Sequence, residues 1–330
     1  MKIKGGKFLI TGGASMIGAH ITEQLLSSDA REIILFDNYS LGSPEGISDL
    51  VVNPRVKFVR GDILRVNELF DALDGVDGVF AAAGFLTLPL TQNPGLGVAV
   101  NVQGMMNVFE ACRYRKAAKV IFSSSIAVYG EPSAELIEEA TPWTWSKLQP
   151  GAALYAASKI MGENIAKLYH DRYGVNSISL RYSSVYGERQ HLRAVNSVYI
   201  IDTYERLKKG ERPIIPDDGL EVHDYIHVAD VARANLVAME SDVSRESFNV
   251  ATGTATTLNR LVEIVQEITG TSLKPEYKTP PGKIRAAVST RLDFSIEKIE
   301  RMIGWKPQIS FEDGIRRMIK WREAERSNAA

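Results

Sequence analysis

Two side chains that together can move a proton stand close to each other in the middle of the sequence. Tyr155 and Lys159 are four residues apart, so they share one face if their segment is helical. A free phenol ionises only near about pH 10, and a nearby positive charge lowers its pKa toward neutrality. The serine run Ser123–Ser125 closes an apolar run and offers a hydroxyl to a substrate oxygen. The pattern predicts a tyrosine acid or base, with stabilisation of a loop as the alternative role for the serines.

A glycine-rich loop near the amino terminus points to a second kind of chemistry. Gly12 and Gly18 occupy its first and last positions, with Ser15 in the middle. Such a loop between a strand and a helix lets backbone amides approach a pyrophosphate at the helix N-terminus. Asp37 follows about 20 residues later, where a carboxylate can accept both ribose hydroxyls and repel a 2′-phosphate. The order predicts NAD rather than NADP, and the alternative is a bare turn beside an unrelated aspartate.

The elements that must position these residues alternate along the first half of the chain. Helical spacing of apolar residues covers 17–26, 94–115 and 154–173. Apolar runs of strand length separate them, at 7–11, 32–37, 56–59, 78–83, 119–123 and 177–181. Strands that alternate with helices favour a parallel sheet covered on both faces, so we expect an α/β fold with a doubly wound Rossmann sheet.

The composition of the 330-residue chain excludes several other classes of function. Lys and Arg total 39 and Asp and Glu total 40, so the net charge of −1 gives no electrostatic footprint for nucleic acid or an anionic membrane. The single cysteine, Cys112, excludes an internal disulfide and a multi-cysteine metal cluster. No apolar signal segment opens the sequence, and no apolar run reaches the roughly 20 residues that a membrane span needs. We therefore expect a cytoplasmic protein whose partner is a small-molecule substrate.

With these features in place, the chain resembles the extended short-chain dehydrogenase/reductase family, in its NAD-dependent epimerase/dehydratase branch. Further matching segments follow in order along nearly the whole length, at 61–63, 101–104, 181–187, 223–232, 248–251 and 303–307. The resemblance implies a Rossmann domain at 1–182 plus 233–258 and a smaller, discontinuous α/β substrate domain at 183–232 plus 259–330. It also implies a homodimer that pairs the helices near 94–115 and 154–173.

The resemblance implies a role for each matching residue. Tyr155 is the acid or base at the substrate hydroxyl, Lys159 binds the nicotinamide ribose and lowers the pKa of Tyr155, and Ser125 matches the catalytic Ser/Thr position. Residues expected at NAD are Gly12, Ser15, Met16, Ile17, Gly18, Asp37, Asn38, Asp62, Ile63, Ala81, Ala82, Ala83, Gly84, Asn101, Ser123, Tyr155, Lys159, Tyr182, Ser183 and Val185. Residues expected at the substrate are Ser125, Ser184, Arg189 and His223.

Departures from the family pattern narrow the chemistry. Ile126 and Ala127 follow Ser125, where dehydratases of this branch carry an Asp-Glu pair and nucleotide-sugar decarboxylases carry a Glu. The chain therefore lacks the groups for eliminating water and keeps hydride removal and return. Three positions that commonly contact a nucleotide diphosphate also differ, because Ser184 replaces Asn, and His223 and Lys283 replace Arg.

These features leave three hypotheses. The first is an NAD-dependent epimerase acting on a nucleotide sugar, most directly a UDP-sugar 4-epimerase. The second is an NAD-dependent dehydrogenase or reductase acting on a hydroxylated substrate that lacks a diphosphate. The third is a non-catalytic NAD-binding protein, which has no need of Ser125, Tyr155 and Lys159 together. We expect no metal, because His223 and His227 have no further cluster of ligands placed to complete a shell.

Overall fold

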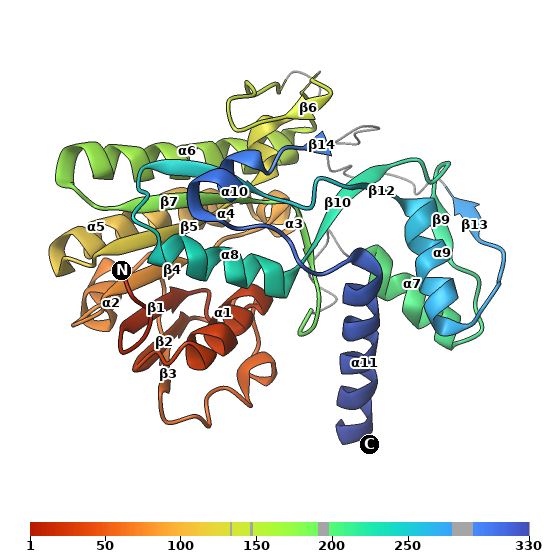
Figure 1. Ribbon diagram of the computed structural model, residues 1–330, viewed down its shortest axis with the longest axis horizontal. Coiled ribbons are helices and arrows are strands. Elements are labelled where there is room, and N and C mark those ends of the chain that lie inside the picture. The colour runs from red at the N-terminus through yellow and green to blue at the C-terminus, as the bar shows by residue number, and fades with distance from the viewer. Residues whose placement is uncertain (133, 146–147, 191–197, 279–292, 330) are drawn as a thin grey trace.

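A computed structural model describes residues 1–329 of the chain, except for 133, 146–147, 191–197 and 279–292 (Figure 1). Lys283, one of the positions expected near a diphosphate, lies outside the described residues. Within the described part, no helix combines the length and the apolarity needed to cross a bilayer. The cytoplasmic location stays a prediction.

A seven-stranded parallel sheet forms the centre of the larger part of the molecule. Its strand order is β11-β7-β5-β4-β1-β2-β3, and each neighbouring pair is parallel. The strands are β1 (Lys7–Thr11), β2 (Glu32–Asp37), β3 (Val56–Arg60), β4 (Gly78–Ala81), β5 (Lys119–Ser125), β7 (Ser177–Tyr182) and β11 (Glu246–Val250). The expected α/β Rossmann architecture is confirmed.

Helices cover both faces of this sheet, which explains why its central strands are continuous apolar runs. On one face α1 (Met16–Ser27) packs beside α8 (Val228–Glu240), and both contribute to one apolar core. On the other face lie α2 (Val66–Ala72), α5 (Met105–Arg115) and α6 (Pro150–Tyr173), around a second core (Figure 1). The two cores hold the strands from both sides, so the carboxyl ends of the strands form a fixed platform.

The two helices expected to carry functional residues form with local modifications. The segment 94–115 is one helical run made of α4 (Pro94–Val98), a π-helical stretch η2 (Ala99–Gly104) and α5. α6 begins with Pro150, whose fixed φ suits a first helical position, four residues before the predicted start. It ends at Gly174 in the left-handed region, as the sequence predicted.

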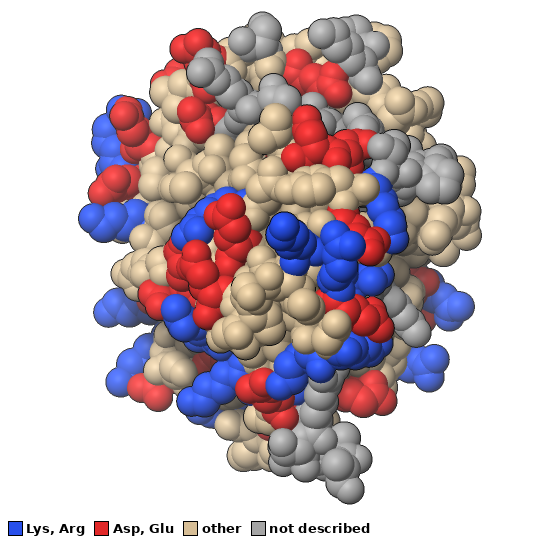
Figure 2. All heavy atoms as spheres, turned by 90° about the vertical axis from the view of Figure 1, so that its right-hand side faces the viewer, with Lys and Arg blue, Asp and Glu red and all other residues tan. Residues whose placement is uncertain are grey.

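The second half of the chain builds a smaller part beside the sheet. Its core is formed by apolar residues of helices α7 (Val198–Lys208), α9 (Leu258–Thr269) and α11 (Phe311–Ala329) with short strands. The strands are β8 (Ser184–Tyr186), β10 (Val222–His227) and β12 (Ala255–Thr257) in one sheet, and β9 (Ile214–Pro216) and β13 (Glu276–Lys278) in another. Figure 2 shows acidic and basic side chains interspersed among the described residues of this face, rather than gathered by sign.

Segments near the predicted domain boundaries pack as follows, and the boundaries themselves stay a prediction. α8 packs on α1 from its first turn, where Gln24 donates a 2.7 Å hydrogen bond to the Ala229 carbonyl. β12 pairs with β10 in the smaller sheet. α10 (Glu297–Ile303) and Trp305 join the first core of the large sheet. Packing explains these positions, because each segment lies against the apolar surface that its own apolar residues can cover.

The remaining short elements surround the carboxyl ends of the strands. They are η1 (Glu45–Ile47), α3 (Thr87–Gln92), the 3-10 turn η3 (Ile126–Tyr129), and the strand pair β6 (Leu136–Ile137) with β14 (Asp293–Phe294).

Candidate active site

The glycine loop forms the tight turn that the sequence predicted. Ser15 caps α1, and its hydroxyl accepts a 3.1 Å hydrogen bond from the Gly18 amide. A Cβ at Gly12, which has φ of +70°, would lie 2.9 Å from the Ala83 backbone, and one at Gly18 would lie 2.6 Å from the Gly12 carbonyl oxygen. Both positions therefore require glycine, and the loop backbone lies open toward the pocket beside it.

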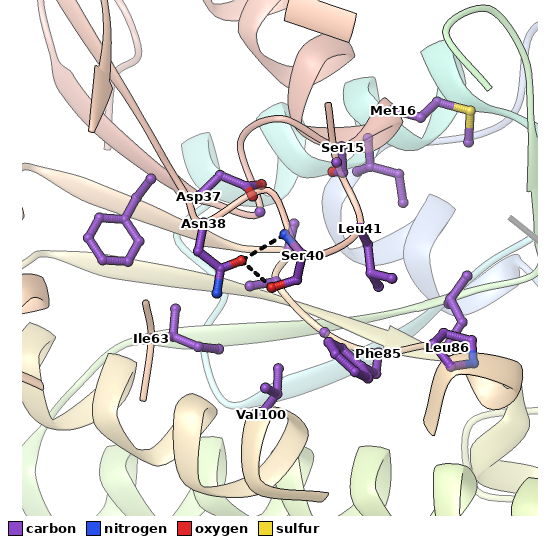
Figure 3. A pocket seen from close by; sticks show the side chains of 18 of the residues that line it. Ser15, Met16, Asp37, Asn38, Ser40, Leu41, Ile63, Phe85, Leu86 and Val100 are labelled. Atoms are coloured by element: carbon purple, nitrogen blue, oxygen red, sulfur yellow. Dashed lines mark hydrogen bonds between the residues drawn. The ribbon is translucent and has the colours of Figure 1, made fainter. Parts of the chain in front are cut away.

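Asp37 stands at the end of β2 and faces the same pocket (Figure 3). Its carboxylate accepts hydrogen bonds from the amides of Ala14, at 3.0 Å, and Tyr39, at 2.7 Å. Burial raises the pKa of Asp37, and these amides act in the opposite direction. Next to it, Asn38 accepts hydrogen bonds from the amide and hydroxyl of Ser40, which orders the loop after β2. The arrangement holds a hydrogen-bond acceptor at the edge of the pocket, as a ribose requires.

One long pocket runs along the carboxyl ends of the strands from Asp37 toward α3. Predicted NAD contacts that line it are Gly12, Ser15, Met16, Ile17, Asp37, Asn38, Asp62, Ile63, Ala82, Ala83 and Gly84. Sequence reasoning missed other lining residues, namely Phe36, Ser40, Leu41, Gly42, Gly61, Phe85, Leu86, Pro89, Val100 and Gln190. Most of these lie in loops without periodic spacing, so only the family motifs beside them could have indicated them.

Asn101 joins the far end of this pocket to α6. It lies in the π-helical stretch η2, a feature frequent at functional sites, and its side chain bonds both the amide and the carbonyl of Phe85, at 2.7 and 2.9 Å. The Asn101 side-chain nitrogen Nδ2 also donates a 3.1 Å hydrogen bond to the Ser158 hydroxyl. A Cβ at Gly84 would lie 3.4 Å from Lys159 Nζ, so the pocket reaches the predicted catalytic lysine.

The predicted catalytic side chains are brought together where the pocket ends. Tyr155 and Lys159 are buried on one face of α6, and Lys159 Nζ donates a 2.8 Å hydrogen bond to the Ser123 carbonyl at the end of β5. Ser125 ends β5, and its hydroxyl accepts from the Ala127 amide at 3.2 Å. Tyr155 packs in a small cluster with Phe85, which lines the pocket. The geometry thus unites a phenol, an ammonium group and a hydroxyl beside one cavity.

Burial controls the acidities of these groups. It raises the pKa of Tyr155 to about 12, while the Ser125 hydroxyl acts in the opposite direction. Burial lowers the pKa of Lys159 to about 8, while the charge of Glu163 acts in the opposite direction. The lowered phenol pKa expected from the sequence is therefore not what these residues give on their own, because burial outweighs the hydrogen bond with the Ser125 hydroxyl.

The residues expected near the nicotinamide at the end of β7 have side chains that contact other residues of the protein. The Tyr182 hydroxyl lies 3.2 Å from Ser123 Oγ and accepts from Asn235 Nδ2 at 2.8 Å. Ser183 donates to the buried carboxylate of Asp224 at 2.7 Å. Ser184 and Val185 belong to β8, where Ser184 is buried opposite Tyr225 of β10 and Val185 packs against the first core.

The two basic side chains expected at the substrate both contact carboxylates. Arg189 makes five hydrogen bonds of 2.5–3.1 Å, to Glu23, to Asp49 and to the Gly46 carbonyl, and thereby ties η1 to α1. This commits all five of its N–H donors, although Arg189 also lines the pocket, and its contact with a substrate stays a prediction. His223 Nε2 lies 2.9 Å from Glu221 Oε1.

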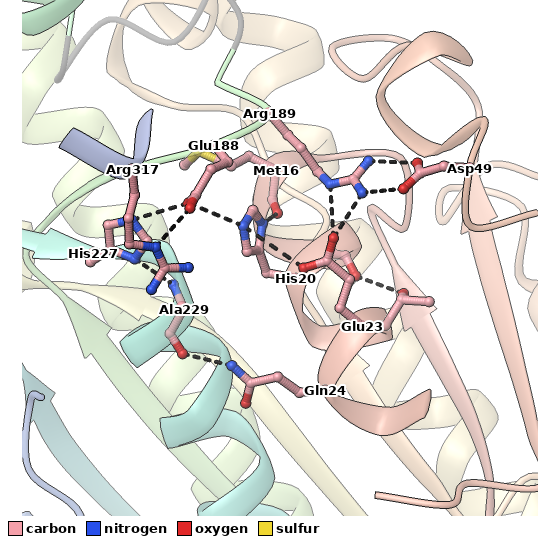
Figure 4. A network of polar contacts seen from close by, with 12 residues as sticks. Met16, His20, Glu23, Gln24, Asp49, Glu188, Arg189, His227, Ala229 and Arg317 are labelled. Atoms are coloured by element: carbon pink, nitrogen blue, oxygen red, sulfur yellow. Dashed lines mark hydrogen bonds and ion pairs between the residues drawn. The ribbon is translucent and has the colours of Figure 1, made fainter. Parts of the chain in front are cut away.

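Glu188, the residue before Arg189, gathers side chains from both parts of the molecule (Figure 4). Its carboxylate receives Arg317 of α11 at 2.9 Å and lies 3.1 Å from His227 Nε2 and 3.6 Å from His20 Nε2. His227 Nδ1 accepts from the Ala229 amide, so its proton is on the nitrogen that faces Glu188. Burial alone would raise the pKa of Glu188, but the contacts with the two histidines hold it well below its usual range. This cluster links α1, the end of β10 and α11.

Comparisons with known proteins match the chain over most of its length. The model of the NAD dependent epimerase/dehydratase family matches residues 8–251. A Methanocaldococcus jannaschii protein that carries a provisional UDP-glucose 4-epimerase name is 35% identical over 320 residues, which cover 95% of this chain and 97% of the relative.

Two solved structures share the whole architecture. The UDP-N-acetylglucosamine 4-epimerase from Methanobrevibacter ruminantium M1, in complex with UDP-N-acetylmuramic acid, has a TM-score of 0.87 and 30% identity, and the match covers 98% of this chain and 99% of that one. The UDP-glucose 4-epimerase from Thermus thermophilus, in complex with NAD, has a TM-score of 0.81 and 31% identity over 96% of this chain and 99% of that one.

Proposed function

The chain belongs to the NAD-dependent epimerase/dehydratase family, and we propose that within this family it is a UDP-sugar 4-epimerase. The family resemblance, the enzyme class and the NAD cofactor expected from the sequence are confirmed. The observation that carries the proposal is that Lys159 lies next to Gly84 and Tyr155 next to Phe85, both of which line the pocket, with Ser125 beside Tyr155. Relatives and structural neighbours that carry 4-epimerase names support the choice of substrate.

The residues around the pocket fit NAD. The close approach at Gly12 and Gly18 leaves the loop backbone accessible to a pyrophosphate, and Asp37 provides the ribose acceptor. NAD, when bound, supplies a hydride acceptor that can return the hydride. Tyr155 would take the proton of the sugar 4-hydroxyl and give it back, so no net proton or hydride is lost over the cycle. Ser125 would donate a hydrogen bond to the same oxygen, and Lys159 would hold the nicotinamide ribose.

The turn after Ser125 favours epimerisation over elimination. Ile126 and Ala127 of η3 have hydrocarbon side chains, so this turn offers neither an acid to a leaving hydroxyl nor a base to a neighbouring carbon. An oxidised sugar that rotates and accepts the hydride on its other face needs neither group.

A dehydrogenase or reductase acting on a hydroxylated substrate without a diphosphate is the second candidate. It is favoured by the side chains of Arg189 and His223, which contact Glu23, Asp49 and Glu221 rather than being left open for phosphate. Purified protein mixed with NAD and a panel of UDP-sugars separates the two candidates. Formation of the 4-epimer is expected, whereas net NADH release with a simple alcohol and no epimer would refute the epimerase.

We also propose a homodimer through α5 and α6. Leu154, Met161 and Leu168 recur every seven residues along α6 and are 39%, 49% and 56% exposed, so they form an apolar stripe on its outer face. Tyr114 of α5 is also exposed. A second copy would cover this stripe. Light scattering should give twice the mass of one chain, and Met161→Glu should give a monomer. A wild-type monomer at micromolar concentration would contradict the dimer.

A further inference from the structure

A buried ion pair lies directly behind the catalytic side chains. Glu163 of α6 is 4% exposed, and its carboxylate accepts hydrogen bonds from Arg181 Nε at 2.8 Å and Nη2 at 2.7 Å. It also accepts from the hydroxyls of Ser124, at 2.7 Å, and Ser247, at 3.0 Å. Four donors from three strands therefore converge on one carboxylate, and all of its contacts are inside the protein.

The Glu163–Arg181 pair forms hydrogen bonds on both sides of the segment that carries the catalytic groups of β5. Ser124 lies between Ser123, whose carbonyl accepts from Lys159, and Ser125. Beyond this segment, Arg181 Nη1 donates to the Tyr129 hydroxyl at 2.8 Å, at the end of the turn η3. The two partners thus hold the strand end and the following turn from one side, and Ser125 lies between the two attachment points.

Glu163 also stands one helical turn beyond Lys159, so its charge acts on the lysine. The groups that face Lys159 Nζ are the rings of Phe122, at 5.3 Å, and Tyr155, at 5.8 Å, and the Ser123 carbonyl. None of these groups carries a negative charge while Tyr155 is protonated. Glu163 is the charged group that acts against the burial of the lysine, and the Arg181 guanidinium reaches it from the far side, on β7.

We propose that Glu163 is a positioning residue of the active site, which keeps Lys159 protonated and, through Ser124, fixes the strand end that carries Ser123 and Ser125. The inference rests on the proposed function in taking Tyr155, Lys159 and Ser125 as the catalytic groups. If it holds, a neutral side chain at position 163 makes Lys159 release its proton at a lower pH. Activity on the alkaline side is then lost at a lower pH, since the protonated lysine is the useful form.

The test compares Glu163→Gln with Ser247→Ala, a matched control that removes one hydrogen bond to the same carboxylate and leaves its charge. In the full-length chain, competitive acylation of lysines across a pH series reports the pKa of Lys159 without any turnover. We expect this pKa to fall by about one unit in Glu163→Gln, a tenfold change in the protonation equilibrium, and to stay in place in Ser247→Ala. The alkaline limb of kcat should move with it.

A second variant tests the positioning half of the proposal. Ser124→Ala keeps the charge of Glu163 and releases the strand end, so it should lower kcat and leave the Lys159 pKa unchanged. Full activity in Ser124→Ala would overturn the positioning role. If Glu163→Gln does not fold, the double variant Glu163→Gln with Arg181→Met removes both buried charges and is used instead. We then expect a smaller fall of the Lys159 pKa in the same direction, because the loss of the more distant Arg181 charge partly compensates for the loss of the Glu163 charge.

An unchanged Lys159 pKa in the folded neutral variant overturns the electrostatic role, even if that variant melts earlier and turns over more slowly. A lower melting temperature and a slower turnover follow from any damage to the core, whereas a changed pKa of Lys159 alone does not. Failure of the wild-type chain to convert any UDP-sugar would refute the proposed substrate instead, and the acylation result would still decide the role of Glu163.

Discussion

Glu188→Gln should destabilise the fold by several kcal/mol at neutral pH. The Glu188 side chain is 15% exposed and lies within 3.6 Å of one guanidinium, that of Arg317, and of two imidazoles, those of His227 and His20. Removing one partner of a buried pair costs about 3–5 kcal/mol, because the remaining charge stays without compensation. Arg317 is 47% exposed and can turn to solvent, which places the expected loss near the lower limit, at about 3 kcal/mol.

This loss is large enough to measure by thermal unfolding. A chain of 330 residues unfolds with an entropy of roughly 0.7 kcal/mol per kelvin, so about 3 kcal/mol lowers the Tm by about 4 °C. The matched control is Glu263→Gln, because Glu263 is 60% exposed and pairs with Arg260 at 3.2 Å on the surface. A surface pair contributes about 0–1 kcal/mol, so the control should lose no more than about 1.5 °C.

The pH dependence of the difference checks the cause. The pKa of Glu188 is held below its usual range in the folded chain, so its contribution is complete above the unfolded value of about 4.3 and disappears as the pH falls below it. The gap in Tm between wild type and Glu188→Gln should therefore be full at pH 7 and should shrink below about pH 4.3. A gap under about 1 °C at pH 7, or an equal loss in Glu263→Gln, would refute the reasoning.

Three further changes test the site. Tyr155→Phe should abolish hydride transfer and leave NAD affinity within about threefold, since the phenol hydroxyl alone is lost; turnover retained in this variant would show that another group moves the proton. Gly12→Ala should weaken NAD binding at least about tenfold by calorimetry, because its Cβ would lie 2.9 Å from the Ala83 backbone at φ of +70°, and unchanged affinity would mean that the loop can relax. Glu221→Gln should tighten the binding of UDP if a diphosphate uses His223, because the variant removes a competing carboxylate 2.9 Å away; equal affinity would place the diphosphate elsewhere.

The parts of the site that the sequence could predict are those encoded over short distances. The strand–loop–helix order around Gly12 and the later Asp37 depends on turn geometry and on apolar spacing, and both are local. The spacing of Tyr155 and Lys159 likewise fixes their common face once α6 forms. For these residues, knowing the element is nearly the same as knowing the geometry.

What the sequence could not predict depends on contacts between distant segments. Arg189 binds Asp49, 140 positions earlier, and no local spacing of residues indicates this pairing. Glu163 meets Ser247, 84 positions later, only because β11 returns to the sheet beside β7. The direction of the Tyr155 pKa was also out of reach, since it depends on how completely the phenol is buried.

The choice between the two substrate classes depends on which basic side chain, Arg189 or His223, can exchange its carboxylate partner for a phosphate with little loss of stability. Releasing Arg189 would break five hydrogen bonds that join η1 to α1, so this guanidinium is a costly phosphate ligand. His223 contacts the Glu221 carboxylate, two residues away on the same segment, through one ring nitrogen. A diphosphate that replaces Glu221 therefore disturbs little of the fold. If UDP-sugars bind this protein, His223 is the group whose exchange of partners the structure permits, and the epimerase proposal depends on that exchange.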